Sequence, residues 1–127
     1  MLDHVSCTVK NLEKSYDFYS SVFGLKIVRE WKRENEGLSA KLLGSDSGPL
    51  IELVESRNPL MFRGTPGDFH EIGMRHIGFS VENLEQAIDK VIEYGGKLVN
   101  GPNKGITVKR WAFVADPDGI TIELMEL

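Results

Sequence analysis

The chain contains two similar stretches, "HVSCTVKNLE" at residues 4–13 and "HIGFSVENLE" at residues 76–85. When His4 is aligned with His76, an offset of 76 − 4 = 72 residues, the first, sixth, eighth, ninth and tenth positions are identical. Two copies of so long a unit do not make a solenoid, which needs three or more short repeats. The repetition indicates a duplicated module whose two halves pack on each other.

A second match closes each module. The triplet "IEL" occurs at residues 51–53 and again at 122–124. The two matches together define a first module over about residues 1–55, a connection over 56–74 and a second module over about 75–127. At 127 residues the chain has the length of one domain with a real core, so we expect a single domain built from both modules.

Each module predicts the same order of elements, a strand, a helix and three further strands. Period-2 alternation of apolar residues marks the strands. Asn11 and Asn83 are predicted to cap the helix N-termini, and Gly24 and Gly95 to end the helices in the left-handed conformation. The expected strands cover about residues 3–10, 25–31, 38–43 and 49–55, and then 75–82, 97–99, 108–115 and 120–126. This is an α+β fold, in which two βαβββ modules form a curved, mostly antiparallel eight-stranded sheet around a cleft, with a helix outside each half.

Composition excludes several classes of protein. Apolar residues make up 41% and charged residues 27% of the chain, which is an ordinary globular balance. A net charge of −4 argues against a nucleic-acid surface, which is normally basic. No apolar run is long enough to cross a membrane, and residues 1–10 lack the pattern of a signal peptide. The single cysteine, Cys7, fits a reducing environment, so we expect a cytoplasmic protein.

The alternation of side chains along a strand brings four polar residues to equivalent places in the two modules. In each "IEL" triplet the two apolar residues are predicted to face the helix, so Glu52 and Glu123 point the opposite way. His4 and His76 begin the two matching strands on the face that the apolar residues leave free. If the two modules pair, both imidazoles and both carboxylates converge in the cleft.

This set of four residues predicts a metal site. Two carboxylates alone in a site of low dielectric constant would repel each other, and a divalent cation removes that repulsion. Imidazole nitrogen and carboxylate oxygen are suitable ligands for zinc, nickel, cobalt or iron. Taken singly, a histidine at a strand start is usually a hydrogen-bonded structural residue, and a glutamate on a strand usually faces solvent. The repeat-equivalent placement favours the metal site, although duplication alone could preserve the residues for symmetric packing.

Four stretches of the sequence resemble the vicinal oxygen chelate superfamily, also called the glyoxalase/bleomycin-resistance/dioxygenase family. They cover most of the chain and read "LDHVSCTVKNLEKSYDFYSSVFGLKIV", "PLIELVE", "RHIGFSVENLEQAIDKVIEYGG" and "AFVADPDGITIELME". In that family the metal ligands come from the first and last strands of each module. The resemblance therefore implies that His4, Glu52, His76 and Glu123 bind the metal.

The four-ligand set is most similar to that of glyoxalase I, or lactoylglutathione lyase. The resemblance implies a divalent cofactor, nickel, zinc or cobalt, that acts as a Lewis acid. It implies a lyase or isomerase reaction, in which a proton moves next to a carbonyl by way of a metal-bound enediolate. A ligand carboxylate would carry that proton. Glu123 is the first candidate for this base, and the near-symmetry of the modules leaves Glu52 as the second.

Three other functions within the superfamily stay open to different degrees. Methylmalonyl-CoA epimerases are similar but commonly carry glutamine where this chain has Glu52. Extradiol dioxygenases use two histidines and one carboxylate, so a fourth ligand weakens that interpretation. Proteins that bind bleomycin or another drug without turnover lack the metal, whereas all four ligand positions are filled here. The small-molecule partner implied is a thiol conjugate or an acyl-CoA.

The sequence leaves two geometric questions undecided. Members of the family usually form dimers, so a homodimer is expected, with a site either inside one chain or shared between two subunits. The strand at 108–114 offers the cleft either Trp111 and Phe113 or Arg110 and Ala112, and its register is not fixed by the pattern.

Overall fold

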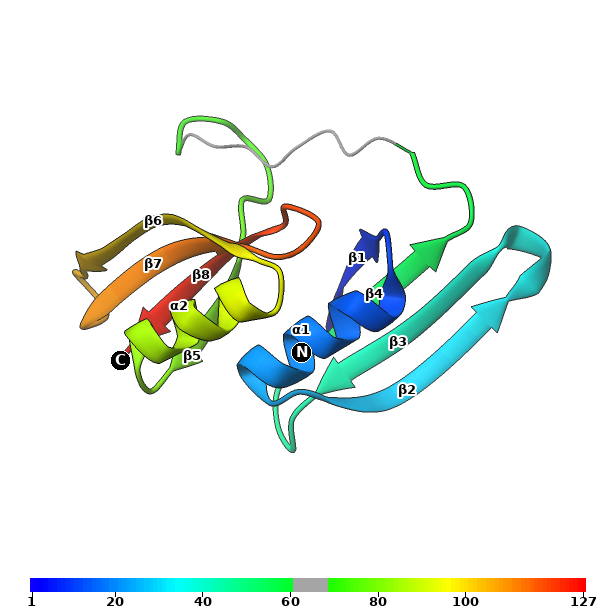
Figure 1. Cartoon of the computed structure of the whole chain (residues 1–127), viewed down its shortest axis with the longest axis horizontal. Helices are drawn as coiled ribbons and strands as arrows, with labels where there is room; N and C mark the ends of the chain where they lie inside the picture. The colour runs from blue at the N-terminus through cyan, green and yellow to red at the C-terminus, as the bar shows by residue number, and fades with distance from the viewer. Residues whose placement is uncertain (61–68) are drawn as a thin grey trace. The chain divides into compact units, whose positions relative to one another are not determined.

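The computed structural model describes residues 1–60 and 69–127 (Figure 1). The chain divides into two compact units, Met1–Met61 and Phe62–Leu127. Each unit contains one of the two predicted modules. The middle of the predicted connection lies outside the described residues.

Unit 1 holds four strands and a helix in the predicted order. The elements are β1 (His4–Val9), α1 (Leu12–Phe23), β2 (Lys26–Arg33), a short 3₁₀ helix η1 (Glu34–Glu36), β3 (Leu38–Gly44) and β4 (Leu50–Ser56). The strands form one sheet in the order β1-β4-β3-β2. The outer strand β1 pairs with β4 in parallel, and the other neighbours pair antiparallel. The first and last strands of the module are therefore direct neighbours.

Unit 2 repeats this topology. Its elements are β5 (Ile77–Val81), α2 (Leu84–Glu93), β6 (Lys97–Lys104), β7 (Arg110–Ala115) and β8 (Thr121–Glu126). The sheet order is β5-β8-β7-β6, with β5 parallel to β8 and the remaining pairs antiparallel. The predicted α+β class and the two βαβββ modules are confirmed. The eight strands are divided over two mixed sheets of four strands, in each of which antiparallel pairing predominates.

The helices begin and end where their capping residues predict. The Asn11 side chain accepts a hydrogen bond from the Lys14 amide at 2.9 Å, and that of Asn83 accepts one from the Gln86 amide at the same distance. Each cap satisfies an amide that the first helical turn leaves without a partner. Gly24 ends α1 with φ of 69°, a left-handed conformation that glycine adopts without strain.

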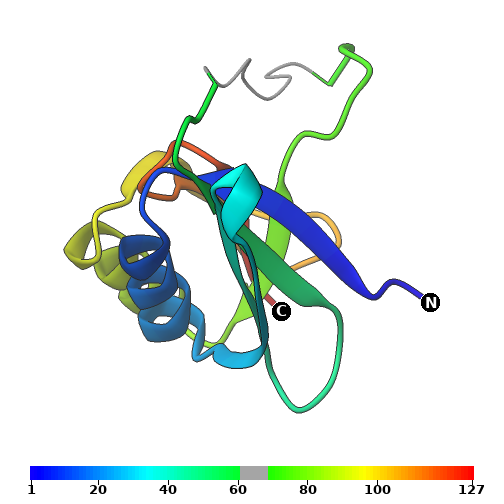
Figure 2. The same ribbon diagram turned by 90° about the vertical axis from the view of Figure 1, so that its right-hand side faces the viewer.

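Each sheet packs its apolar face against its helix. In unit 1, Phe18 and Tyr19 of α1 are fully buried and meet edge to face, with ring centroids 5.0 Å apart. Ile51 and Leu53 of β4 are also buried. Figures 1 and 2 show α1 lying along one face of the sheet of unit 1. Glu52 stands between two buried neighbours on the strand, so its side chain is directed to the face that α1 leaves uncovered.

Unit 2 has the same arrangement around β8. Ile122 and Leu124 are fully buried, as are Leu84 and Val91 of α2. The "DPDG" turn leads into β8, because the Asp116 carboxylate accepts from the amides of Asp118 and Ile120, each at 2.9 Å. This turn joins β7 to β8 and supports the register in which Glu123 lies opposite Phe113.

A further repeated contact joins each helix to its last strand. Glu55 accepts a hydrogen bond from the Leu12 amide at 3.4 Å, and Glu126 accepts one from the Leu84 amide at 3.1 Å. These amides belong to the first residue of each helix, where no backbone acceptor is available. The contact holds the helix N-terminus over the strand that carries the predicted ligand.

Candidate metal site

The strand register places a histidine and a glutamate in the same relation in both units. Ser6 of β1 lies opposite Glu52 of β4, and Gly78 of β5 lies opposite Glu123 of β8. Each predicted histidine precedes that opposite residue by two positions, so it shares its face of the sheet. The parallel pairing of the first and last strands therefore places the repeated histidine and glutamate on one sheet face in each unit. We call these two sets the histidine–glutamate pairs.

The pair in unit 2 is in direct contact. His76 Nε2 lies 3.0 Å from Glu123 Oε2, and both side chains are 23% exposed. This is a hydrogen-bonding distance. Two donors about 2.1 Å from one ion are about 3.0 Å apart at an angle of about 90° and about 3.4 Å apart at the tetrahedral angle. The two atoms therefore lie within a few tenths of an ångström of the spacing of neighbouring ligands.

Two aromatic rings lie on the same sheet face as the unit 2 pair. Phe113 lies opposite Glu123 in the ladder, and its ring centroid is 5.2 Å from that of His76. Trp111 lies on the same face, 5.1 Å from Phe113 between centroids. Arg110 faces the other way, toward Glu85 of α2. The register that the sequence left open therefore brings the aromatic residues, not the arginine, to the glutamate.

The glutamate in unit 1 has polar surroundings instead. Ser6 Oγ donates to Glu52 Oε1 at 2.8 Å, and the Trp31 indole N–H donates to Glu52 Oε2 at 2.9 Å. The hydrogen bond from Trp31, then that from Ser6 and the charges of His4 and Arg29, hold the pKa of Glu52 below its ordinary value. Both oxygens of this carboxylate are thus oriented by donors from its own unit.

His4 is oriented by the residue that precedes it. Its Nδ1 lies 2.7 Å from Asp3 Oδ2, and Arg29 contacts the same Asp3 oxygen at 3.3 Å. The hydrogen bond with His4, followed by the charge of Arg29, lowers the pKa of Asp3. When a carboxylate accepts a hydrogen bond from Nδ1, the other ring nitrogen, Nε2, keeps a free electron pair with which it can bind a metal ion. His76 differs, because its Nδ1 is buried without a hydrogen-bond partner in the described part of the chain.

The donor chemistry of the two pairs fits a divalent ion of the zinc, cobalt or nickel type. Each pair offers one imidazole nitrogen and one carboxylate oxygen, the ligands these ions accept. Within residues 1–60 and 69–127 the structure contains no group of three or more histidine, cysteine or acidic side chains placed for a metal ion. Each unit by itself carries two of the four predicted ligands, in contact with each other in unit 2, and this is fewer than the three or four protein ligands that zinc sites use.

Three of the orienting residues were not identified from the sequence. Trp31 and Arg29 share a strand, and the pattern of β2 gives little indication of their roles because its residues are mostly exposed and a bulge interrupts the register between Ile27 and Arg29. Asp3 carried a usable signal, since it adjoins a predicted histidine ligand and a carboxylate is the usual partner of a ligating imidazole.

Residues 1–124 match the family described as Glyoxalase/Bleomycin resistance protein/Dioxygenase superfamily. The chain belongs to this superfamily. The match spans both units, so the histidine–glutamate pairs lie within the glyoxalase-type region.

Individual members of the superfamily support the same assignment. The lactoylglutathione lyase of Escherichia coli O157:H7 is 36% identical over 127 residues, which cover 97% of this chain and 90% of the relative. The trypanothione-dependent glyoxalase I of Leishmania major has a TM-score of 0.78 at 24% identity, covering 99% of this chain and 86% of that one. A glyoxalase family protein from Bacillus cereus has a TM-score of 0.81 at 20% identity, covering 98% and 92%. The structural matches establish the glyoxalase fold.

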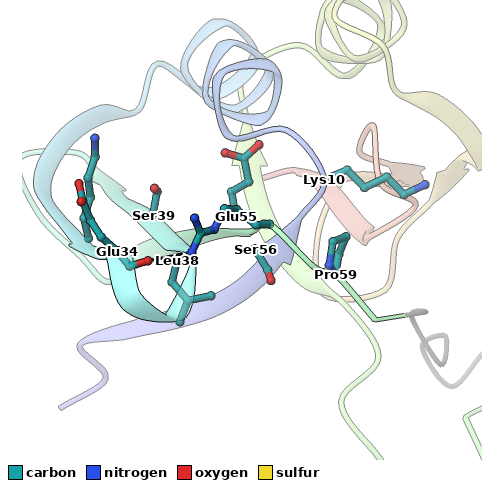
Figure 3. A pocket seen from close by; sticks show the side chains of 10 residues that line it. Lys10, Glu34, Leu38, Ser39, Glu55, Ser56 and Pro59 are labelled. Atoms are coloured by element: carbon teal, nitrogen blue, oxygen red, sulfur yellow. Dashed lines mark hydrogen bonds between the residues drawn. The ribbon is translucent and has the colours of Figure 1, made fainter.

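Unit 1 also has an open hollow of about 640 Å³ that is separate from the histidine–glutamate pair (Figure 3). It is lined by residues that include Lys10, Lys32, Glu55 and Arg57, and by none of the predicted ligands. The hollow adjoins the N-terminal turn of α1 through Glu55.

Neither helix in the described part of the chain is long and apolar enough to cross a bilayer.

Proposed function

We propose that the protein is a metal-dependent lyase or isomerase of the glyoxalase I type. His4, Glu52, His76 and Glu123 bind one divalent ion, nickel, zinc or cobalt. The observation that carries this proposal is the duplicated register, which gives each unit one imidazole and one carboxylate on the same sheet face. The 36% identity to a lactoylglutathione lyase supports the reaction class. The substrate is a small molecule, in the first place a hemithioacetal formed from a thiol.

The two glutamates have different roles in this proposal. Glu52 stays a fixed ligand, because Ser6 and Trp31 hold both of its oxygens. Glu123 removes a proton from the carbon next to the substrate carbonyl and returns it to the neighbouring carbon. It suits this role because, among the described residues, its contact with His76 engages one carboxylate oxygen, and the Phe113 ring lies beside the pair. The bound ion supplies Lewis-acid stabilisation of the negative charge that develops during proton removal.

The assembly proposed is a homodimer. The site can form in two ways: from unit 1 and unit 2 of one chain, or from unit 1 of one subunit and unit 2 of the other. Both arrangements give one ion per chain, because each chain carries four ligands. A mixed dimer made from His4→Ala and His76→Ala chains separates the two cases. If the sites are shared between subunits, one of the two sites in this dimer has all four ligands, and the other lacks both histidines. If each site lies inside one chain, each of the two sites lacks one histidine.

We also propose a reducing, cytoplasmic location, on the ground of the single cysteine.

The test is a measurement of metal content followed by an assay of isomerisation. The protein is purified without chelator, and its nickel, cobalt and zinc are measured alongside those of His76→Ala. Hemithioacetal isomerisation is then assayed with each ion added back. The proposal expects one ion per chain, loss of that ion in the variant, and turnover that depends on the ion.

Two results would replace this function by another. If the protein bound the ion but only exchanged the α-proton of an acyl-CoA in heavy water, it would be an epimerase. If it bound a small molecule without any turnover, and kept that binding after Glu123→Gln, it would be a sequestering protein of the resistance type.

A further inference from the structure

Trp31 makes a contact with the metal site that has no counterpart among residues 69–127 of unit 2. Its indole N–H donates to Glu52 Oε2 at 2.9 Å, while Ser6 Oγ holds Oε1 at 2.8 Å. Within the described residues Glu123 has one such contact, with His76, and the residue opposite it is Gly78, which has no side chain to donate. The indole is thus a feature of one glutamate and not of the repeat.

The indole must cross a whole strand to reach Glu52. Trp31 lies on β2 and Glu52 on β4, with β3 between them. The residue of β3 opposite Trp31 is Ala40, which is 3% exposed. A small side chain at that place lets the large ring lie across the sheet. Arg33 then covers the ring, with its guanidinium carbon 5.4 Å from the centroid.

The two hydrogen bonds leave room for a metal ion. A carboxylate has about four lone-pair positions, so one donor on each oxygen still leaves a lone pair on each. A rigid indole offers a single N–H in a fixed direction, and Ser6 fixes the second oxygen. The carboxylate plane is therefore set before any ion arrives, and hydrogen-bonded partners of this kind commonly change metal affinity by 10–100-fold.

We propose that Trp31 is a positioning residue of the metal site, which together with Ser6 holds Glu52 as an immobile ligand. This inference rests on the proposed function, because it assumes that Glu52 binds the ion. The two glutamates then have different roles. Glu52 of unit 1 is oriented before the ion binds, and Glu123 of unit 2 remains free to transfer a proton. The indole N–H also becomes a direct reporter of the ion.

The first experiment observes the indole in the unaltered protein. The chain has two tryptophans, Trp31 and Trp111, so nitrogen-15 labelling of tryptophan gives two indole signals, which Trp111→Phe assigns. Zinc, which is diamagnetic, is then titrated into the metal-free protein. We expect the Trp31 signal to shift in step with zinc binding and to remain in slow hydrogen exchange. A Trp31 signal that ignores bound zinc, or that exchanges as fast as an exposed indole, would overturn the inference.

The second experiment measures the dissociation constants of zinc and nickel by competition with a chromophoric chelator. Trp31→Phe keeps an aromatic side chain and removes the indole N–H, so it should weaken binding about 10–100-fold. Tyr16→Phe removes the polar group of an aromatic residue of α1 that contacts Lys41 and none of the predicted ligands, so it should leave the constants within about 2-fold. Ser6→Ala should weaken metal binding. Ser6→Thr keeps the hydroxyl and should bind as the parent does. Thr8→Val, which removes a hydroxyl from the same strand, is the matched control and should not weaken binding. Equal losses in Trp31→Phe and Tyr16→Phe would count against a positioning role.

Failure of the inference and failure of the proposed function give different results. If the unaltered protein binds no divalent ion, the proposed function is wrong. If it binds an ion that His4→Ala abolishes, and Trp31→Phe and Ser6→Ala bind as tightly as the parent, the metal site stands and the role of Trp31 is wrong.

Discussion

The two units place a histidine and a glutamate in the same register, yet they surround the glutamate differently. Glu52 accepts hydrogen bonds on both oxygens, from Ser6 and Trp31, whereas Glu123 contacts His76 through one oxygen and lies opposite Phe113. The repeated part of the fold thus sets where the donors lie. The part that differs between the units determines how firmly each donor is held, and this separates a structural ligand from a candidate base.

The largest expected effect tests that separation directly. Glu123→Gln should lower the kcat for hemithioacetal isomerisation about 10²–10⁴-fold, because an amide cannot accept the proton in the transition state. Glu52→Gln is the matched change in the other unit and should chiefly weaken metal binding, so that part of its kcat returns at high nickel concentration. The assay compares kcat for both variants over a range of nickel concentrations.

If the two variants gave the opposite results, the assignment of Glu123 as the base and Glu52 as the fixed ligand would be wrong. Recovery of Glu123→Gln by added nickel, together with an irreversible loss of activity in Glu52→Gln, would make Glu52 the base.

The core of the two units, unlike the site, should respond alike to substitution. Leu53 and Leu124 follow the two predicted glutamate ligands, and both are fully buried. Replacing either with alanine removes buried methyl groups and leaves a cavity, so each change should cost about 2–5 kcal/mol of unfolding free energy. Urea unfolding measures the loss for each variant. A cost below about 1 kcal/mol in one unit alone would show that the two sheets are not packed equally.

Most of the fold could be predicted from the sequence because its signals are local. Alternation of apolar residues marked the strands, and Asn11 and Asn83 marked the starts of both helices, as observed. The strand β6 was predicted too short, at 97–99 instead of Lys97–Lys104. Gly101 and Pro102 indicate a break in a central strand, but β6 lies at the edge of its sheet, where a missing N–H is tolerated.

The candidate site was less predictable because its contacts cross strands. Alternation gave the face on which Glu52 and Glu123 lie, and the repeat gave their equivalence. The hydrogen bond from Trp31 was not predictable, since it depends on the pairing of β2 with β3 and on the small residue at Ala40. Pairing partners distant in sequence are not encoded in the pattern of a single strand, so the neighbours of a ligand require the structure.

A second difference between the units concerns the glutamate that holds each helix N-terminus. Glu126 lies 2.8 Å from Lys109 and 2.6 Å from Arg110 and accepts from the Leu84 amide. These contacts, Lys109 first, lower its pKa from 4.5 to about 2. Because the folded state favours the charged form, the stabilisation is fully present above pH 4.5 and is lost as the pH falls toward about 2.

Glu126→Gln should therefore lower stability at pH 7 and flatten the dependence of stability on pH between about 4.5 and 2. Thermal unfolding at a series of pH values measures this. Glu55→Gln is the control, since Glu55 makes the equivalent helix contact at the longer distance of 3.4 Å. An unchanged pH profile in Glu126→Gln would show that the ion pairs do not contribute to folding.

The smallest effect should come from making unit 2 resemble unit 1 at one position. Gly78→Ser places a hydroxyl opposite Glu123, as Ser6 lies opposite Glu52. An added Cβ would come 3.1 Å from Met125 Cε, the flexible end of a side chain, which can shift by the few tenths of an ångström required. The new hydroxyl should donate to Glu123 and stabilise its charged form. A hydrogen bond to a carboxylate of about 1.5 kcal/mol corresponds to a fall of roughly 10-fold in kcat.

Metal affinity should be retained or slightly improved in this variant, because the hydroxyl orients a ligand without removing one. Gly78→Ala carries the same Cβ without the hydroxyl and separates crowding by Met125 from the hydrogen bond. If Gly78→Ala and Gly78→Ser lose activity equally, the loss comes from crowding. If Gly78→Ser alone is slower while its nickel dissociation constant is unchanged, a single hydrogen bond is enough to make the unit 2 glutamate behave as the unit 1 glutamate does. That result would attribute the freedom of Glu123 to the missing side chain at position 78.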